Sequence, residues 1–363
     1  MLKKAAALML VCASTGAWMG CGTTSSNYLY ATIPASNEIV AFREDPNSGA
    51  LLQLVGSPIT AGQAVQSLVI HPSNKFLYAA NSGATPNGTV STFSISSGGA
   101  LTEVGQRQAV GTAPTLLAMD QSGSFLYVAN SGSSDISVFS INSSTGALTL
   151  VSQTGGSTAS IGMSALNMQL SPSGNTLWVT GQVVATQGFI QEFPVSNGVI
   201  GAPVAGSPFL TGNGPYGLVI DSGGTHLYTA NKNDSSISAF SINSSGALTL
   251  ISTLGVTSSG PVALFIDKSG KYMYVANQQS SSGNLAAYSI GSDGNLTVLT
   301  NSPFATGPQP SFITGDPNGK YLFVGNQSTP VIQSFSLDPG SGTLTSVNSY
   351  SVPGTPTSIA VTH

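Results

Sequence analysis

Short apolar runs alternate with Gly- and Ser-rich turns along most of the chain. One run recurs with nearly the same residues, and its seven copies begin at Leu29, Leu77, Leu126, Leu177, Leu227, Met273 and Leu322. The third copy reads Leu126-Tyr127-Val128-Ala129-Asn130, and successive copies start 46 to 51 residues apart. A period of this length predicts a repeat protein in which each repeat is one supersecondary unit.

Each repeat divides into four short strands. In the third repeat the runs cover Thr115 to Asp120, Phe125 to Asn130, Ile136 to Ile141 and Ala147 to Ser152. Tyr, Val, Ile and Phe fill these runs, and Gly, Ser and Asn separate them, as expected for strands joined by turns. Four strands at this period are typical of a β-propeller blade.

The two ends of the repeat region complement each other. The region begins with the second strand of a blade, at Tyr28 to Thr32, and it ends with a first strand, at Thr357 to Thr362. Pairing of the C-terminal strand with the N-terminal strands would close the ring and remove open sheet edges. The sequence therefore predicts an all-β fold, a seven-bladed β-propeller over residues 28–363 with four antiparallel strands per blade. The repeat leaves no room for a second domain.

Charged side chains are few. The 363 residues include 9 Lys or Arg and 13 Asp or Glu, whereas about a quarter of residues are charged in an ordinary globular domain. Ser, Thr, Asn and Gly supply the polarity instead, and these residues favour turns over helix interiors. Hydrophobic residues make up 40% of the chain and recur in ordered runs, so the composition does not indicate disorder.

The first residues read as an export signal. Lys3 and Lys4 precede a short apolar run over residues 5–17, and Gly20 precedes Cys21. This pattern predicts a lipoprotein-type signal peptide over residues 1–20, lipidation of Cys21, and a flexible tether over residues 21–27. An ordinary secretory signal with an incidental Cys is the alternative.

Cysteine content agrees with a lipid anchor. Cys12 would leave with the signal, so Cys21 would be the sole remaining Cys and no internal disulfide could form. We expect an exported protein anchored to the cell envelope, facing the periplasm or on the outer membrane, or alternatively secreted. The lipid would be its only membrane contact. Removal of the signal leaves 7 basic and 13 acidic residues, a net charge of −6, which argues against a nucleic-acid partner.

Several motifs resemble one known family. The Tyr-Val-Ala-Asn run, the Asp120-Gln121-Ser122-Gly123 turn and the Ser-Val-Phe-Ser-Ile strand at residues 137–141 are similar to repeats of the bacterial lactonase family of seven-bladed propellers. That family includes 6-phosphogluconolactonase-like enzymes and a muconate-lactonizing branch. The resemblance covers residues 28–363. It implies a metal-independent carboxylic ester hydrolase that uses no cofactor and acts through His, Arg and Glu around the central channel.

The stretches that carry the family's catalytic residues differ in this chain. The first corresponds to Pro114-Thr115-Leu116-Leu117, which has no His. The second corresponds to residues 214–217, Gly-Pro-Tyr-Gly, followed by Asn231-Lys232, where Arg, His and Glu are all replaced. No catalytic residue can be transferred by position, so the resemblance leaves enzymatic activity uncertain.

Most acidic residues fall in turns that would lie on one face of the ring. Side chains of Asp in such turns bond nearby backbone amides. The turns between first and second strands hold Asp120, Asp221, Asp267 and Asp316, and the turns between third and fourth strands hold Asp45, Asp293 and Asp338. We interpret all seven as structural.

The opposite face, at the other mouth of the channel, carries the candidate binding residues. They are Glu38, Arg107, Asp135, Lys232 and Asp234. Each alone is explained as a solvated loop charge, but together they are the charges near a channel mouth. Glu192 is added because the other blades have a small or apolar residue at its position, and a buried carboxylate is costly unless paired. A local structural adjustment is the alternative for Glu192. His71, His226 and His363 are too scattered to predict a metal site.

Three functions remain open. The leading hypothesis is a cell-envelope module that binds a small molecule, glycan or peptide at the channel mouth. The alternative is a lactone-ring hydrolase that uses Arg107 with Glu38, Asp135 or Asp234. The third is a structural envelope protein without a ligand. The sequence does not indicate the oligomeric state.

Overall fold

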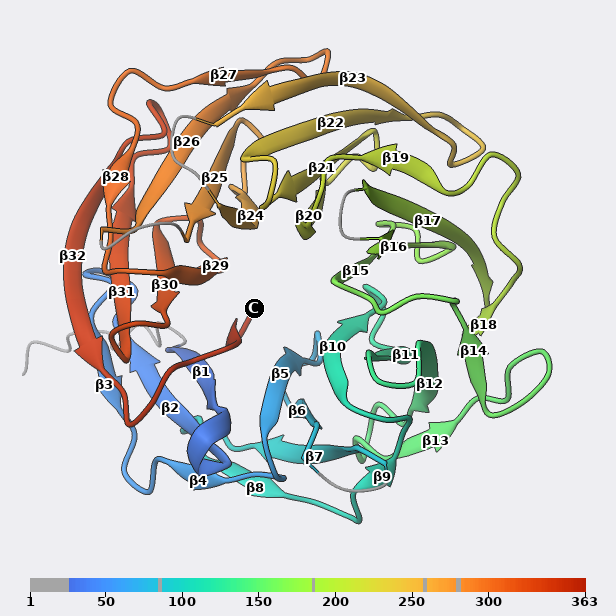
Figure 1. Ribbon diagram of the computed structural model, residues 1–363. Helices are drawn as coiled ribbons and strands as arrows, with labels where there is room; N and C mark the ends of the chain where they lie inside the picture. The colour runs from blue at the N-terminus through green and yellow to red at the C-terminus, as the bar shows by residue number, and fades with distance from the viewer. Residues whose placement is uncertain (1–25, 84–86, 185–186, 257–259, 279–281) are drawn as a thin grey trace, which may run out of the picture.

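Seven antiparallel sheets are arranged around a central axis in the computed structural model (Figure 1). The structure describes residues 26–83, 87–184, 187–256, 260–278 and 282–363. The predicted export signal and Cys21 lie outside these ranges. No helix in the described ranges is long and apolar enough to cross a membrane.

Each blade has four main strands, ordered from the innermost strand, at the channel, to the outermost strand, at the rim. The innermost strands are β33 (Ile359–Val361), β5 (Val65–Ile70), β10 (Pro114–Met119), β15 (Asn167–Leu170), β20 (Pro215–Ile220), β24 (Pro261–Ile266) and β29 (Pro310–Gly315). The second strands are β1 (Asn27–Ile33), β6 (Phe76–Asn81), β11 (Phe125–Asn130), β16 (Thr176–Val184), β21 (His226–Asn231), β25 (Tyr272–Asn277) and β30 (Tyr321–Asn326).

The outer half of each blade follows the same order. The third strands are β2 (Glu38–Glu44), β7 (Thr89–Ile95), β12 (Asp135–Ile141), β17 (Gln187–Ser196), β22 (Ser236–Ile242), β26 (Asn284–Ile290) and β31 (Val331–Leu337). The outermost strands are β3 (Leu51–Gln53), β8 (Leu101–Glu103), β13 (Leu148–Leu150), β18 (Val199–Ile200), β23 (Leu248–Gly255), β27 (Leu296–Val298) and β32 (Leu344–Ser351). One short 3-10 helix, η1 (Pro34–Ser36), lies between β1 and β2.

The ring closes as predicted. The C-terminal β33 pairs antiparallel with β1, with Leu29 opposite Val361 and Ala31 opposite Ile359. Backbone hydrogen bonds beyond the ladder extend this seam, including one of 2.9 Å from Thr362 N to Tyr28 O. The first blade is therefore built from both ends of the repeat region, which closes the ring of blades (Figure 1).

The outermost strand differs from the prediction in five blades. A single outer strand was expected over Ala147 to Ser152, but β13 ends at Leu150 and the chain returns to the same sheet as β14 (Thr158–Ser160). The corresponding short strands in the other four blades are β4 (Ile59–Thr60), β9 (Gln108–Ala109), β19 (Phe209–Thr211) and β28 (Phe304–Ala305). Each connecting segment contains Gly or Pro, which do not continue a regular ladder.

The hydrophobic core lies between neighbouring blades. One cluster joins Tyr127 and Ile136 of blade 3 to Leu177 and Phe193 of blade 4, and all four side chains are at most 1% exposed. The second strands are buried on both faces, which explains their continuous apolar sequences.

A repeated hydrogen bond ties each of several blades to the next. The hydroxyl of a second-strand Tyr donates to a Gly carbonyl in the turn between the third and fourth strands of the following blade, at 2.7 to 3.0 Å. The pairs are Tyr30 with Gly99, Tyr78 with Gly146, Tyr228 with Gly294 and Tyr274 with Gly342. Each bond satisfies a hydroxyl that would otherwise be costly to bury.

Candidate functional site in the central channel

A cavity of about 1090 Å³ occupies the centre of the ring. Six innermost strands and the segment that precedes β33 line it. Its upper mouth lies where the innermost strands begin and the second strands end. Nine side chains form a polar collar at this mouth: Gln66, Thr115, Asn167, Tyr216, Lys232, Gln278, Ser311, Gln327 and Thr357. At about 1090 Å³ the cavity is large enough to hold a small organic ligand.

β-bulges place several collar residues at the mouth. The register of β10 against β11 shifts between Pro114 and Leu116, which leaves Thr115 as an extra residue. Tyr216 occupies the same position in β20, as Gln66 and Ser311 do in β5 and β29. Pro has no N–H for the ladder, so it suits the start of such a strand. The bulge frees the next residue from regular pairing and re-aims its side chain.

Lys232 is the charged member of the collar. It directly follows β21, and its ammonium lies 5.1 Å from the centroid of the Tyr216 ring, a cation–π distance. Lys232 Nζ also donates to Gln278 Oε1 at 2.7 Å, and Gln278 Nε2 donates to Gln327 Oε1 at 3.0 Å. This chain of contacts connects three neighbouring blades across one side of the mouth.

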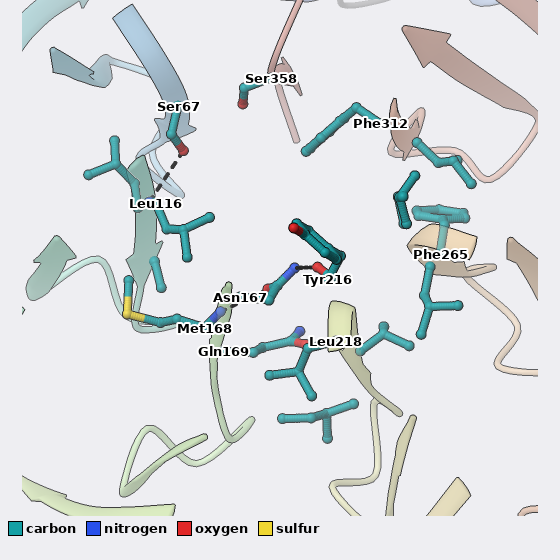
Figure 2. A pocket seen from close by; sticks show the side chains of 18 of the residues that line it. Ser67, Leu116, Asn167, Met168, Gln169, Tyr216, Leu218, Phe265, Phe312 and Ser358 are labelled. Atoms are coloured by element: carbon teal, nitrogen blue, oxygen red, sulfur yellow. Dashed lines mark hydrogen bonds between the residues drawn. The ribbon is translucent and has the colours of Figure 1, made fainter. Parts of the chain in front are cut away.

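Tyr216 projects into the mouth. Asn167 Nδ2 donates to the backbone carbonyl of Tyr216 at 2.8 Å, which fixes the bulge against β15 (Figure 2). Tyr216 itself is 39% exposed and its side chain points toward the channel centre (Figure 2). An aromatic face and a phenolic hydroxyl are thus presented beside the ammonium of Lys232.

Below the collar most of the channel wall is apolar, and the described lining at this level also includes the polar side chains of Ser67, Gln169 and Ser358. Six half-buried side chains form this apolar waist: Leu116, Leu117, Val219, Leu264, Phe265 and Phe312. Leu116 and Phe312 come directly after the bulge residues of their strands, so they lie immediately beneath the collar. Strand geometry makes the waist about 10 Å deep, at about 3.3 Å per residue.

The lower end carries carboxylates that serve their own turns. Asp221 accepts from Thr225 N at 2.7 Å and from Thr225 Oγ1 at 2.6 Å. Burial alone would raise the pKa of Asp221, but hydrogen bonds from Thr225 and His226 hold it below its ordinary value. Asp267 accepts from the backbone amides of Lys271 and Tyr272 at 3.0 and 2.8 Å. These contacts support the structural interpretation of the turn residues.

Of the six candidate residues, Lys232 lines the cavity and the other five do not. Glu38 accepts from Ser36 Oγ at 2.7 Å, Asp135 from Asn130 Nδ2 at 2.7 Å, and Asp234 from the backbone amide of Asn213 at 2.7 Å. Each of these three carboxylates therefore has a local partner in its own loop or blade.

Arg107 lies on the outer rim. Its Nε is 2.7 Å from Glu103 Oε1, and both side chains are about one-third exposed, at 39% and 31%. The guanidinium does not line the channel. Its proposed catalytic partners, Glu38, Asp135 and Asp234, accept hydrogen bonds from other residues. An exposed ion pair of this kind contributes little to stability.

Glu192 is in the core between blades 4 and 5. It is 1% exposed and lies in register with Trp178, which stands where most other blades have the hydrogen-bonding Tyr. The carboxyl group fills the space beside Gly246, in the turn that would receive the Tyr hydroxyl. Burial raises the pKa of Glu192, and the Trp178 indole partly offsets that rise. This position agrees with the structural alternative for Glu192.

A second buried acid was missed at the sequence level. Glu44 is 1% exposed, ends β2 and lies in register with Asn27. Burial raises the pKa of Glu44 to about 7, with smaller contributions from Asp316 and Asp45, and Asn27 opposes the rise. The signal was present, because five other third strands have Ile or Leu at this position.

The uncharged collar residues were missed as well. Tyr216 and Lys232 lie in the stretches that the resemblance singled out, but only charged residues were taken as candidates there. Tyr216, Gln278 and Gln327 could have been found from their places after the first-strand Pro or the second-strand Asn, whereas Asn167 follows Leu166 and carries no such signal. In the described part of the chain, no group of three or more His, Cys, Asp or Glu could hold a metal ion.

Fold and channel together define a seven-bladed propeller with a ligand-sized central cavity. The model of the family "Lactonase, 7-bladed beta-propeller" matches residues 23–164, 201–283 and 281–361. The chain belongs to this family. The unmatched stretch, residues 165–200, contains most of blade 4, including Trp178 and Glu192.

Solved structures share the fold at low sequence identity. A candidate 6-phosphogluconolactonase from Bacteroides fragilis is 23% identical, with a TM-score of 0.80 over 94% of this chain and 99% of that chain. A periplasmic gluconolactonase from Pseudomonas aeruginosa is 18% identical, with a TM-score of 0.74 over 93% and 99%. A protein of unknown function from Desulfotomaculum acetoxidans is 18% identical, with a TM-score of 0.72 over 93% and 99%. No curated protein matches the sequence.

Proposed function

We propose that this chain is a binding propeller that holds a small molecule at the upper mouth of its channel without hydrolysing it. The observation that carries the proposal is the polar collar, with Lys232 against Tyr216 above a cavity of about 1090 Å³. Convergent polar groups at the mouth of a sizeable cavity are the usual form of a small-molecule site.

The lining chemistry favours binding over hydrolysis. Among the described residues that line the cavity there is no His, Arg or Glu. The two lining carboxylates, Asp221 and Asp267, are at the lower end and are engaged by their turns. A general base must come within hydrogen-bond reach of the proton it removes, and the collar offers amides, hydroxyls and one ammonium instead.

A thermal-shift screen against lactones, sugar acids, oligosaccharides and peptides tests this proposal. A ligand that binds only the folded state raises the Tm. We expect a small molecule to stabilise the chain and Lys232→Met to reduce that shift. Lys320→Met, which removes an exposed lysine from a lower turn, is the matched control. A shift that survives Lys232→Met unchanged would locate binding away from the collar.

Lactone hydrolysis is the second candidate, and family membership favours it. Proton release from a lactone, followed in weak buffer, separates the two functions. We expect release at the uncatalysed rate even when the lactone raises the Tm. Release that depends on the chain and disappears in Lys232→Met would instead make this channel a hydrolase site. The alternative from the sequence, a hydrolase that uses Arg107 with Glu38, Asp135 or Asp234, predicts instead that Arg107→Ala abolishes proton release.

We also propose export and lipid anchoring through Cys21. The support is the Lys3-Lys4 and apolar pattern that ends at Gly20-Cys21. In a bacterial host the unmodified chain should fractionate with membranes and Cys21→Ser should not. Equal membrane fractions for both would favour the secretory alternative or another attachment.

A further inference from the structure

We infer that the channel ligand is an amphipathic organic acid, with its anionic group at Lys232 and an apolar body in the waist. This inference rests on the proposed function, since it names the ligand class of the same site. It begins with the order of surfaces along the channel: a polar collar, an apolar waist, and a lower end whose carboxylates are bound by their own turns.

The anionic end is assigned by Lys232. An ammonium has three N–H donors, and the hydrogen bonds of the described residues use one of them, on Gln278. The centroid of the Tyr216 ring lies 5.1 Å from Lys232 Nζ. This contact is with the ring face, so it does not occupy an N–H donor with an oxygen acceptor. Lys232 therefore retains donors for an anionic group, and no described carboxylate forms an ion pair with it.

The apolar end is assigned by the waist. Leu116 and Phe312 begin it one residue below the bulges, and Val219 and Phe265 continue it toward the lower end. All four side chains are half-buried, so each leaves apolar surface facing the cavity. A sugar or other polyol would find partners at this level in Ser67, Gln169 and Ser358, and its remaining hydroxyls would lie against apolar side chains, which costs binding energy. An alkyl or aryl group would instead cover these apolar side chains.

The two ends are close enough for one molecule. Lys232 contacts Tyr216, and Val219 lies three residues further along the same strand, about 10 Å at the strand rise. Tyr216 lies between the ammonium and the waist and offers both a ring face and a hydroxyl. A carboxylate carried on a short alkyl or aryl body matches this spacing.

The test compares four probes on the purified full chain by calorimetry: 3-phenylpropionate, 3-phenylpropionamide, D-gluconate and D-glucose. We expect 3-phenylpropionate to bind at least tenfold more tightly than its neutral amide and than gluconate. Lys232→Met should remove the preference for acid over amide, whereas Lys320→Met should retain it. Leu116→Asn should weaken 3-phenylpropionate at least fivefold and leave gluconate unchanged.

The outcomes separate the two proposals. Binding of gluconate or glucose without 3-phenylpropionate would overturn the amphipathic ligand while the channel remained a binding site. The assignment of an amphipathic acid is also overturned if none of the four probes binds but the wider screen finds a ligand whose binding depends on Lys232. If neither the four probes nor the thermal-shift screen gives binding, the proposed function is overturned too. The comparison of acid with amide uses the unmodified chain, so it stands even if Leu116→Asn fails to fold.

Discussion

The two ends of the channel use the same repeat in opposite ways. At the lower end, Asp267 and its counterparts bond the backbone of their own turns, so their charges serve folding. At the upper end, bulges in five of the innermost strands release one side chain each from the ladder, as at Thr115 and Tyr216. The difference teaches that the carboxylates of the lower turns serve the architecture of the repeat, whereas the residues where first strands begin and second strands end, Lys232 among them, form its site.

The largest expected effect concerns Glu44 near the lower end. A pKa raised from its ordinary 4.5 to about 7 means that the folded chain holds this proton more tightly than the unfolded chain. The associated stability is complete below pH 4.5 and is lost as the pH rises to about 7. Glu44→Gln should therefore match the unmodified chain at about pH 4.5 and exceed it by up to about 3 kcal/mol at about pH 8. Urea unfolding across this pH range measures the difference. If the free energy of unfolding depends on pH in the same way in both proteins, Glu44 ionises normally.

The next effect breaks a lower turn. Asp267→Ala removes the acceptor of two backbone amides and should lower the free energy of unfolding by about 2 kcal/mol. Asp293→Ala, in an exposed turn between third and fourth strands, is the milder control. Probe affinity at the upper mouth should stay the same in both variants. A drop in affinity without loss of stability would mean that the two ends are not separate in function.

A smaller effect tests the hydrogen bonds between blades. Tyr228→Phe removes the 3.0 Å hydrogen bond to Gly294 O and should cost about 1 kcal/mol, since the group is buried. Phe323 is the natural comparison, because blade 7 already has Phe at this position and needs no such bond. Denaturant unfolding measures the cost, and an unchanged midpoint would show that packing alone holds the blades.

The smallest stability effect is expected at the collar. Lys232 is half-buried at the mouth and its contacts are solvent-accessible, so Lys232→Met should change the free energy of unfolding by less than about 0.5 kcal/mol. The same variant should weaken a channel ligand at least tenfold. A large loss of stability would make Lys232 a structural residue and contradict its role at the upper mouth.

Much of the fold was predictable, because the pattern of four strands is repeated and each copy supports the others. The second and third strands of the third repeat match β11 and nearly match β12. The outer strand was predicted less well. Its side chains are mostly exposed, so burial imposes no strict alternation, and its interruption depends on where the chain meets β12 again.

The candidate site was predictable only in part. Lys232 was identified, but Arg107 was placed near the mouth and lies on the rim, paired with Glu103. Sequence position alone does not say whether a loop side chain points toward the axis or away from it. Glu192 illustrates the same limit, because only the packing of Trp178 against the next blade shows why a carboxyl is tolerated there.

The sequence by itself determined the number of blades, the order of their strands and the closure of the ring, because these follow from local periodicity and turn chemistry. The tertiary structure alone decided which residues meet at the axis. Lys232, Gln278 and Gln327 are each about one repeat apart, and they become neighbours only when the blades pack side by side. Contacts between repeats depend on the angle at which whole sheets pack, and no single repeat encodes that angle.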